Sequence, residues 1–195
     1  MRYLSGFAGL AALLAVMIVG CGDSGGSGSD SGSGGRTKIA YLTNNPSDFW
    51  NIARKGVAKA EKELDINVTF KMPPNGTVEE QTRMLESLVA QNYDAVAISP
   101  KDASNMTALL NDVAGKLKLI CVDSDAPESK RLAYVGTDNY AAGRVLGETL
   151  VERVPDGGKI AIFVGTMDAQ NAQDRYRGIK DVIKDKGDKF TEIGE

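Results

Sequence analysis

From Arg36 onward, the chain alternates between short β-rich runs and stretches with the apolar spacing of amphipathic helices. The first pair sets the pattern: residues 38–43 have the composition of a buried strand, and residues 49–64 carry Trp50, Ala53 and Val57 at helical spacing. Further strands are predicted at 68–70, 95–98, 119–122 and 132–135, and further helices at 77–92 and 103–114. Strands and helices that alternate at this spacing form right-handed βαβ units, so we predict an α/β fold with a parallel sheet.

The pattern then restarts. Thr137 or Asp138 can cap a helix that reaches residue 154, followed by a strand at 159–164, a helix at 172–186 and the start of a strand at 190–193. One or two strands do not complete a second sheet. We therefore predict a first α/β lobe over residues 36–137 and a partial second lobe over residues 138–195. On this basis we expect the chain to be a fragment of a longer protein.

The sequence before Arg36 has the organisation of an export signal. An uncharged apolar run from Phe7 to Val19 ends at Cys21, and a Gly/Ser-rich tract fills residues 22–35. The run has the length of a signal peptide and is shorter than the roughly 20 apolar residues of a membrane span. The residues up to Cys21 resemble a bacterial lipobox. We predict a signal peptide over residues 1–20, lipidation of Cys21 and a flexible linker over residues 21–35.

The predicted location is the bacterial cell envelope, on the extracytoplasmic side and tethered to the membrane by lipid. The alternative is an ordinary signal peptide with an incidental cysteine. Removal of residues 1–20 would take one arginine and no acid from a chain of formal net charge −3, which gives a mature charge of −4. A mildly acidic surface of this kind has no general attraction for nucleic acid.

Histidine is absent from the chain. Its absence excludes a Ser-His-Asp triad, a Cys-His pair and a histidine-based zinc site within these 195 residues. We expect no metal, no cofactor and no enzymatic activity. If Cys21 is acylated, Cys121 has no cysteine left to pair with, so we predict that it is a buried thiol without a disulfide.

The candidate site follows from the predicted topology. Ligands of open parallel sheets bind at the carboxyl ends of the strands, which here are residues 43–50, 99–102 and 123–125. These segments contain hydroxyl, amide and carboxylate groups and an aromatic pair. The first strand is followed by neither Gly-x-Gly-x-x-Gly nor a Walker sequence, which disfavours a nucleotide site. Carboxylates and amides bind hydroxyl groups, and aromatic faces pack on the C–H faces of sugar rings, so the segments suit a neutral polyol.

Four segments in order resemble the periplasmic sugar-binding proteins of ABC transporters, the ribose-binding type whose fold is shared by LacI-family effector domains. They are Asn-Asn-Pro-Ser-Asp-Phe-Trp at 44–50, Val-Asp-Ser-Asp at 122–125, Gly-Thr-Asp-Asn-Tyr-Ala-Ala-Gly at 136–143 and Ala-Gln-Asp-Arg-Tyr-Arg-Gly at 172–178. The resemblance implies two Rossmann-like lobes of the type I periplasmic binding protein fold. These lobes would close on a monosaccharide or polyol and deliver it to an ABC-transporter permease.

The resemblance also implies a set of sugar contacts. The residues at the matching positions are Thr43, Ser47, Phe49, Trp50, Asp123, Asp125 and Arg175. In this set the hydroxyls and carboxylates would bind sugar hydroxyls, the aromatics would stack on the ring, and Arg175 would reach in from the second lobe. For the aromatics, the alternative is that one of the two packs into the core. For Arg175, it is a solvated helix charge.

One position departs from the ribose-type pattern, which has arginine directly after the strand-four aspartate. Here that position is Ser124, followed by Asp125, so a donor is replaced by a small hydroxyl and an acceptor. The departure argues against ribose itself and leaves other monosaccharides open. Because further second-lobe contacts are expected beyond Glu195, we expect the 195-residue chain to bind sugar weakly.

Three other functional classes make different demands on the sequence. A sugar-sensing domain that presents its bound form to a membrane receptor remains an alternative. A LacI-type repressor would need a helix-turn-helix where this chain has a signal and a linker. An α/β hydrolase would need a histidine and a nucleophile elbow, and the sequence Gly26-Ser27-Gly28 lies in the predicted linker.

Overall fold

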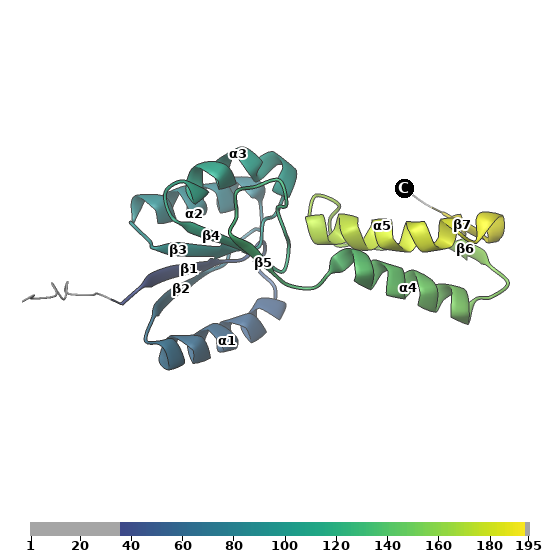
Figure 1. The fold of residues 1–195 in the computed structure, drawn as a ribbon, viewed down its shortest axis with the longest axis horizontal. Helices are drawn as coiled ribbons and strands as arrows, with labels where there is room; N and C mark the ends of the chain where they lie inside the picture. Colours follow the sequence, from purple (N-terminus) through teal and green to yellow (C-terminus); the bar gives the residue numbers. More distant parts are fainter. Residues whose placement is uncertain (1–35, 194–195) are drawn as a thin grey trace, which may run out of the picture. The chain divides into compact units, whose positions relative to one another are not determined.

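The computed structural model describes residues 36–193 (Figure 1). The predicted signal peptide, the lipidation site at Cys21 and the linker at 21–35 fall outside the described residues. No helix in the described part combines the length and the apolar character that a bilayer crossing requires.

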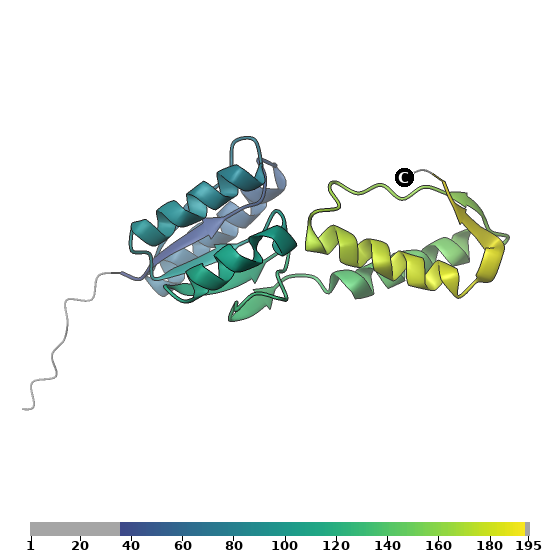
Figure 2. The same cartoon turned by 90° about the horizontal axis from the view of Figure 1, so that it is seen from above.

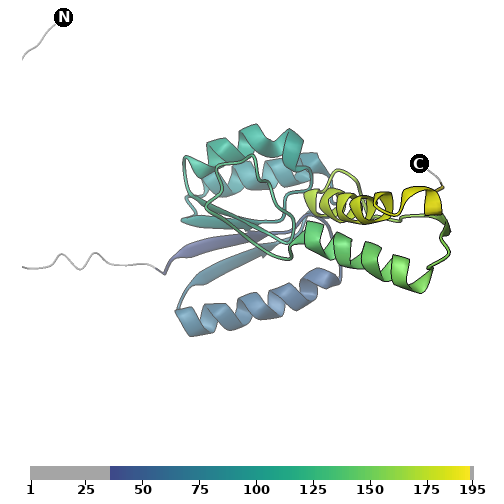
Figure 3. The same ribbon diagram turned by 45° about the vertical axis from the view of Figure 1, so that its right-hand side comes forward.

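A five-stranded parallel sheet is the centre of the first α/β unit, in the order β2-β1-β3-β4-β5. The sheet and its helices confirm the predicted fold class. Figures 1 and 3 show α1 on one face of this sheet and α2 and α3 on the other. The elements are β1 (Lys38–Leu42), α1 (Phe49–Leu64), β2 (Asn67–Lys71), α2 (Val78–Ala90), β3 (Ala95–Ile98), α3 (Ala103–Ala114), β4 (Lys118–Val122) and β5 (Ala133–Val135).

The strand order reverses direction between β1 and β3. From β1 the chain moves outward through α1 to β2, and it then crosses back through α2 to β3 on the other side of β1. At such a switch point the two connections leave the sheet toward opposite faces, which opens a crevice at the carboxyl ends of the strands. This topology therefore directs the loops after β1 and β3 toward a common site.

Side-chain caps fix the beginnings of three helices. Thr77 accepts a hydrogen bond from the Glu80 N–H at 3.2 Å, Asp102 from the Asn105 N–H at 3.0 Å, and Asp138 from the Ala141 N–H at 2.9 Å. Each bond satisfies one of the amides that a helix start leaves without an intrahelical partner. The cap at Asp138 is one of the two that the sequence predicts for α4.

The core of this unit lies between the sheet and the α2–α3 layer. Both strands that flank the switch point are buried, and α2 and α3 pack apolar stripes onto them. Its fully buried members are Ala40, Leu42, Leu85, Leu88, Val96, Ile98, Leu110, Val113, Leu119 and Cys121. The thiol of Cys121 is buried as predicted, and burial raises its pKa to about 12, so it stays protonated near neutral pH.

After β5 the chain continues into a second set of elements. These are α4 (Asn139–Arg153), β6 (Gly158–Ile160), α5 (Gln170–Lys184) and β7 (Phe190–Glu192), and β6 pairs with β7 in parallel. The predicted strand at 159–164 is wrong in its second half. Only β7 pairs with β6 in the described residues, and that pairing ends at Ile160, so residues 161–164 leave the sheet and the Phe163 side chain is 92% exposed.

Helices α4 and α5 pack closely because glycines stand at their crossing (Figure 2). A Cβ atom on Gly143 would lie 2.2 Å from the Arg175 carbonyl oxygen, and a Cβ on Gly178 would lie 2.4 Å from the Tyr140 carbonyl oxygen. Both distances are far inside van der Waals contact, so the backbones could not approach this closely with any other residue. The crossing thereby fixes the backbone of α5 at Arg175.

We expect Gly143→Ala to lower the free energy of unfolding by about 1–3 kcal/mol, the usual cost of overpacking a tight contact. Gly56→Ala is the matched control, since Gly56 is an exposed position of α1 and a Cβ there would have no heavy atom within 4 Å. The control should instead stabilise the protein by about 0.5–1 kcal/mol through helix propensity. Urea unfolding of both variants measures the difference, and equal effects would show that the close crossing is not required.

Candidate functional site

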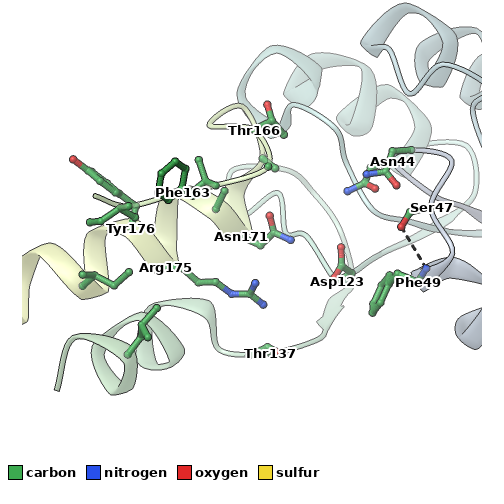
Figure 4. A pocket seen from close by; sticks show the side chains of 18 of the residues that line it. Asn44, Ser47, Phe49, Asp123, Thr137, Phe163, Thr166, Asn171, Arg175 and Tyr176 are labelled. Carbon is green, nitrogen blue, oxygen red and sulfur yellow. Dashed lines mark hydrogen bonds between the residues drawn. The ribbon is translucent and has the colours of Figure 1, made fainter. Parts of the chain in front are cut away.

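A pocket of about 930 Å³ joins the loops after β1 and β4 to residues of the second set of elements (Figure 4). Its lining combines a carboxylate, a guanidinium, amides and hydroxyls with apolar and aromatic side chains. The polar lining residues are Asn44, Asn45, Ser47, Asp123, Thr137, Thr166, Asn171 and Arg175. Phe49, Trp50, Leu146, Leu150, Phe163 and Ile179 are among its apolar and aromatic residues.

The side-chain amide of Gln81 holds together the two strand ends at the switch point. Its Nε2 donates to the Thr43 and Ser99 carbonyl oxygens, both at 2.8 Å, and its Oε1 accepts from the Lys101 N–H at 2.8 Å. Gln81 is fully buried on α2, so its two bonds to carbonyls form away from water, and the bond from Lys101 is partly buried. The amide therefore fixes the loop after β1 against the loop after β3.

Asp123 follows β4 in an unusual backbone conformation. Its φ is 62°, a left-handed value that few non-glycine residues adopt. The Ser124 N–H donates to the Val122 carbonyl at 2.7 Å, so Asp123 is the central residue of a γ-turn. Strained residues of this kind persist where the surroundings hold them, and they cluster at functional sites. The turn directs the Asp123 side chain into the pocket (Figure 4).

The Asp123 carboxylate is half-buried, and burial raises its pKa above the usual range. The Ser99 hydroxyl donates to its Oδ2 at 3.1 Å and the positive charge of Arg175 also favours ionisation, but desolvation outweighs both. Because the folded pKa is raised, the carboxylate lowers the free energy of unfolding as the pH rises from its unfolded pKa through its folded pKa. An ionised carboxylate in the pocket therefore makes the folded protein less stable at pH values above its folded pKa.

The two aromatic residues of the loop after β1 have different environments. Trp50 is 2% exposed, and its Nε1 donates to the Asn45 Oδ1 at 3.0 Å, which anchors the loop. Phe49 is 55% exposed and packs edge-on against the Trp50 ring at 5.0 Å between centroids. Of these two residues, Phe49 is thus the one that presents free ring surface to the pocket. Ser47 lies beside it and accepts from the Phe49 N–H at 3.3 Å.

The structure brings five of the seven predicted contact residues to the pocket wall: Ser47, Phe49, Trp50, Asp123 and Arg175. Thr43 lies outside the lining, because it is fully buried and its hydroxyl donates to the Asn45 carbonyl at 3.1 Å. Asp125 also lies outside, because both of its carboxylate oxygens accept from Arg131, one of them at 2.7 Å. Ser124, the position that departs from the ribose-type pattern, is fully buried and does not line the pocket.

Sequence reasoning missed several residues that build the site. The sequence contains a signal for Gln81, because this residue lies in the apolar stripe of α2, four residues before Leu85. A polar residue at such a position needs buried hydrogen-bond partners. Asn171 precedes Arg175 by four residues on α5, so the two share one face of that helix. Phe163 comes from the second half of the predicted strand at 159–164, and Thr166 comes from the loop that follows it. The described residues contain no group of His, Cys, Asp and Glu that could hold a metal ion.

The chain matches the family model described as the periplasmic binding protein domain over residues 39–195. Since this match covers most of the chain, the protein belongs to the periplasmic binding protein family. The assignment agrees with the resemblance seen in the sequence and with the parallel order of the five strands.

The similar proteins are named as sugar-binding proteins. The ribose import binding protein RbsB of Bacillus subtilis is 27% identical over 144 residues, which are 73% of this chain and 46% of that protein. The D-ribose/D-allose-binding protein of Pseudomonas aeruginosa is 27% identical over 171 residues, 81% of this chain and 53% of that protein. The chain thus spans about half the length of the curated relatives it matches.

Solved structures give the same relationship. GanP, a glucose-galactose binding protein from Geobacillus stearothermophilus, has a TM-score of 0.77 and 27% identity, with 82% of this chain and 57% of that chain covered. An ABC transporter solute binding protein from Burkholderia graminis in complex with D-arabinose has a TM-score of 0.75 and 25% identity, with 80% and 54% covered.

We expect Gln81→Met to destabilise the fold by several kcal/mol, because it leaves two buried carbonyls without partners, at about 1–3 kcal/mol each, and one partly buried N–H as well. Gln91→Met is the control, since Gln91 is exposed and its side chain donates only to the Ser87 hydroxyl, at 2.7 Å. Thermal and urea unfolding of both variants measure the effect. A Gln81 variant as stable as the control would show that the amide does not hold the two loops.

Proposed function

We propose that this protein captures a neutral monosaccharide or a similar polyol in the pocket and releases it unchanged. The observation that carries the proposal is the pairing of an ionisable acceptor, Asp123, with an exposed aromatic ring, Phe49, in one pocket wall. A carboxylate accepts hydrogen bonds from hydroxyl groups, and an aromatic face covers the C–H face of a sugar ring.

The charges of the lining support a neutral ligand. Asp123 and Arg175 are the charged members of the wall, and their charges are opposite. A phosphorylated or carboxylated sugar would bring a negative charge to this balanced pair, whereas a neutral sugar can donate to the carboxylate and accept from the guanidinium. Asn44, Asn171 and Ser47 add amides and a hydroxyl, which serve as donors or acceptors. Sugar binding is also what the names of the similar proteins state for those proteins.

The proposal also covers how the protein is anchored in the cell and where it delivers its sugar. We propose that residues 1–20 are removed, that Cys21 carries lipid, and that the protein delivers its sugar to an ABC-transporter permease at the bacterial cell envelope. The domain assignment belongs to the same proposal: a first lobe over 36–137 and a partial second lobe over 138–195 contribute opposite walls of the site. Asp125 and Thr43 do not line the pocket, and their side chains bond to other residues of the proposed first lobe.

Titration with D-ribose, D-xylose, D-arabinose, D-galactose and xylitol tests the binding proposal. The fluorescence of Trp50, the chain's single tryptophan, reports on the pocket wall, and calorimetry gives the affinity. The titrations extend to millimolar sugar. For the sugar that binds best, Asp123→Asn should weaken binding by at least tenfold, since a hydrogen bond to a charged group contributes about 1.5–3 kcal/mol.

Asp112→Asn is the control for this variant, because Asp112 is exposed on α3 and pairs with Lys116 at 2.6 Å. Asp123→Asn should also raise the free energy of unfolding at neutral pH, and this gain should fade as the pH falls through the folded pKa of Asp123 and be absent below its unfolded pKa. Wild-type affinity should decline with falling pH at a higher pH than an exposed aspartate would give. Unchanged affinity in Asp123→Asn would place the site elsewhere.

Fatty-acid labelling in a bacterial host tests the anchor. Wild-type protein should incorporate label and Cys21→Ser should not. Cys121→Ser should label like wild type, because Cys121 is a buried thiol. Equal labelling of wild type and Cys21→Ser would exclude lipidation at Cys21.

A further inference from the structure

The hydroxyl of Tyr134 lies at the centre of a hydrogen-bond network that leads from the Asp123 turn to the start of α4. Its oxygen is 2.8 Å from the Asp123 carbonyl oxygen, 3.0 Å from the Thr137 carbonyl oxygen and 3.1 Å from the Asn139 Nδ2. Tyr134 belongs to β5, Thr137 to the connection that leaves the sheet, and Asn139 to the first turn of α4. One side chain thus contacts both ends of this connection.

The position of the phenol is built into the chain. A Cβ atom on Gly136 would lie 2.3 Å from the Tyr134 hydroxyl oxygen and 2.6 Å from the ring carbon that bears it. The ring therefore folds back over Gly136 into space that only a glycine leaves free. Asn139 is 6% exposed, and its Nδ2 also donates to the Thr137 carbonyl at 3.0 Å, so the amide holds the phenol and the connection together.

The protons of the network determine its direction. A tyrosine hydroxyl has one proton to donate and can also accept. The Asn139 amide donates to the phenol oxygen, which leaves the phenol proton for a carbonyl, and the Asp123 carbonyl is the nearer of the two. The Thr137 carbonyl keeps its bond from Asn139. The chain of bonds therefore runs from Asn139 through Tyr134 to Asp123.

This bond completes the support of the strained turn. The Asp123 N–H donates to the Val135 carbonyl at 3.1 Å, and its own carbonyl accepts from Tyr134 at 2.8 Å. Both peptide groups of Asp123 are thus tied to β5. Because the direction of the Cα–Cβ bond follows from the two peptide planes, the two bonds orient the carboxylate that lines the pocket.

We propose that Tyr134 is a positioning residue that couples the orientation of Asp123 to the connection between the sheet and α4. Tyr134 does not line the pocket, so it acts through Asp123. A change in the connection at residues 137–139 is transmitted through the phenol to the turn, and a ligand held by Asp123 biases the connection in return. The effect on a sugar rests on the proposed function, whereas the coupling itself belongs to the unliganded protein.

Tyr134→Phe removes the hydroxyl and keeps the ring over Gly136. Tyr93→Phe is the matched control, because it removes the single bond from the Tyr93 hydroxyl to Thr69 Oγ1, at 2.9 Å, near β2. Amide hydrogen exchange by NMR is measured on the full chain without sugar. Exchange at the Asp123 and Ser124 amides and at the Ala142 amide should rise together by about tenfold in Tyr134→Phe, the effect of losing one net hydrogen bond. Tyr93→Phe should leave these amides unchanged.

Faster exchange confined to β5, or equal changes in both variants, would overturn the coupling. If Tyr134→Phe does not fold, Asn139→Ala decides the question, since Asn139 does not bond to the turn but should still speed exchange at Asp123 and Ser124. An effect of Asn139→Ala restricted to α4 would also overturn the proposal.

Sugar titration then separates the two proposals. If wild type binds a sugar of the panel, Tyr134→Phe should weaken that binding by about tenfold while Tyr93→Phe leaves it unchanged. Unchanged affinity in Tyr134→Phe would remove the positioning role. If wild type binds none of the sugars, the proposed function fails, and the exchange data still decide whether Tyr134 couples the turn to α4.

Discussion

The fully buried amide of Gln81 is the interaction on which the arrangement of the loops after β1 and β3 depends. Parallel strands end with unpaired backbone groups, and at a switch point the two connections depart in opposite directions. Gln81 satisfies the Thr43 and Ser99 carbonyls and the Lys101 N–H in one place. Since buried polar groups are costly when unpaired, the amide holds these loops in a single arrangement. The hydroxyl of Ser99, fixed in this way, can then donate to Asp123.

Both the backbone and the side chain of Asp123 reduce the stability of the fold. The residue combines a left-handed backbone with a half-buried carboxylate, and each of these features costs folding free energy. Hydrogen bonds to Val135, Tyr134 and Ser99 hold it in place. An acceptor that is both desolvated and fixed in direction is suited to hydroxyl recognition, because its hydrogen bonds form with little reorganisation.

The backbone of Arg175 is positioned by the close packing of α4 against α5. Gly143 and Gly178 let the backbones of α4 and α5 touch, so the place of the Arg175 backbone is set by a steric limit. Tyr140 adds a hydrogen bond to Asp181 at 2.7 Å across the same pair of helices. The arginine side chain remains exposed, which leaves its guanidinium available at the pocket wall.

The sequence alone was enough to predict the α/β class, the order of most strands and helices, two candidate caps for α4 and two of the loops that line the pocket. These features depend on local propensity and on periodicity, which a single segment displays. Which side chains of those loops face the pocket follows from the packed structure. Asp125 pairs with Arg131, Thr43 turns inward and Trp50 is buried while Phe49 is exposed, because each choice depends on how the loop folds back on itself and packs against the sheet. Gln81 and Tyr134 depend on tertiary structure too, since each bonds to the end of a strand that only the assembled sheet brings beside it.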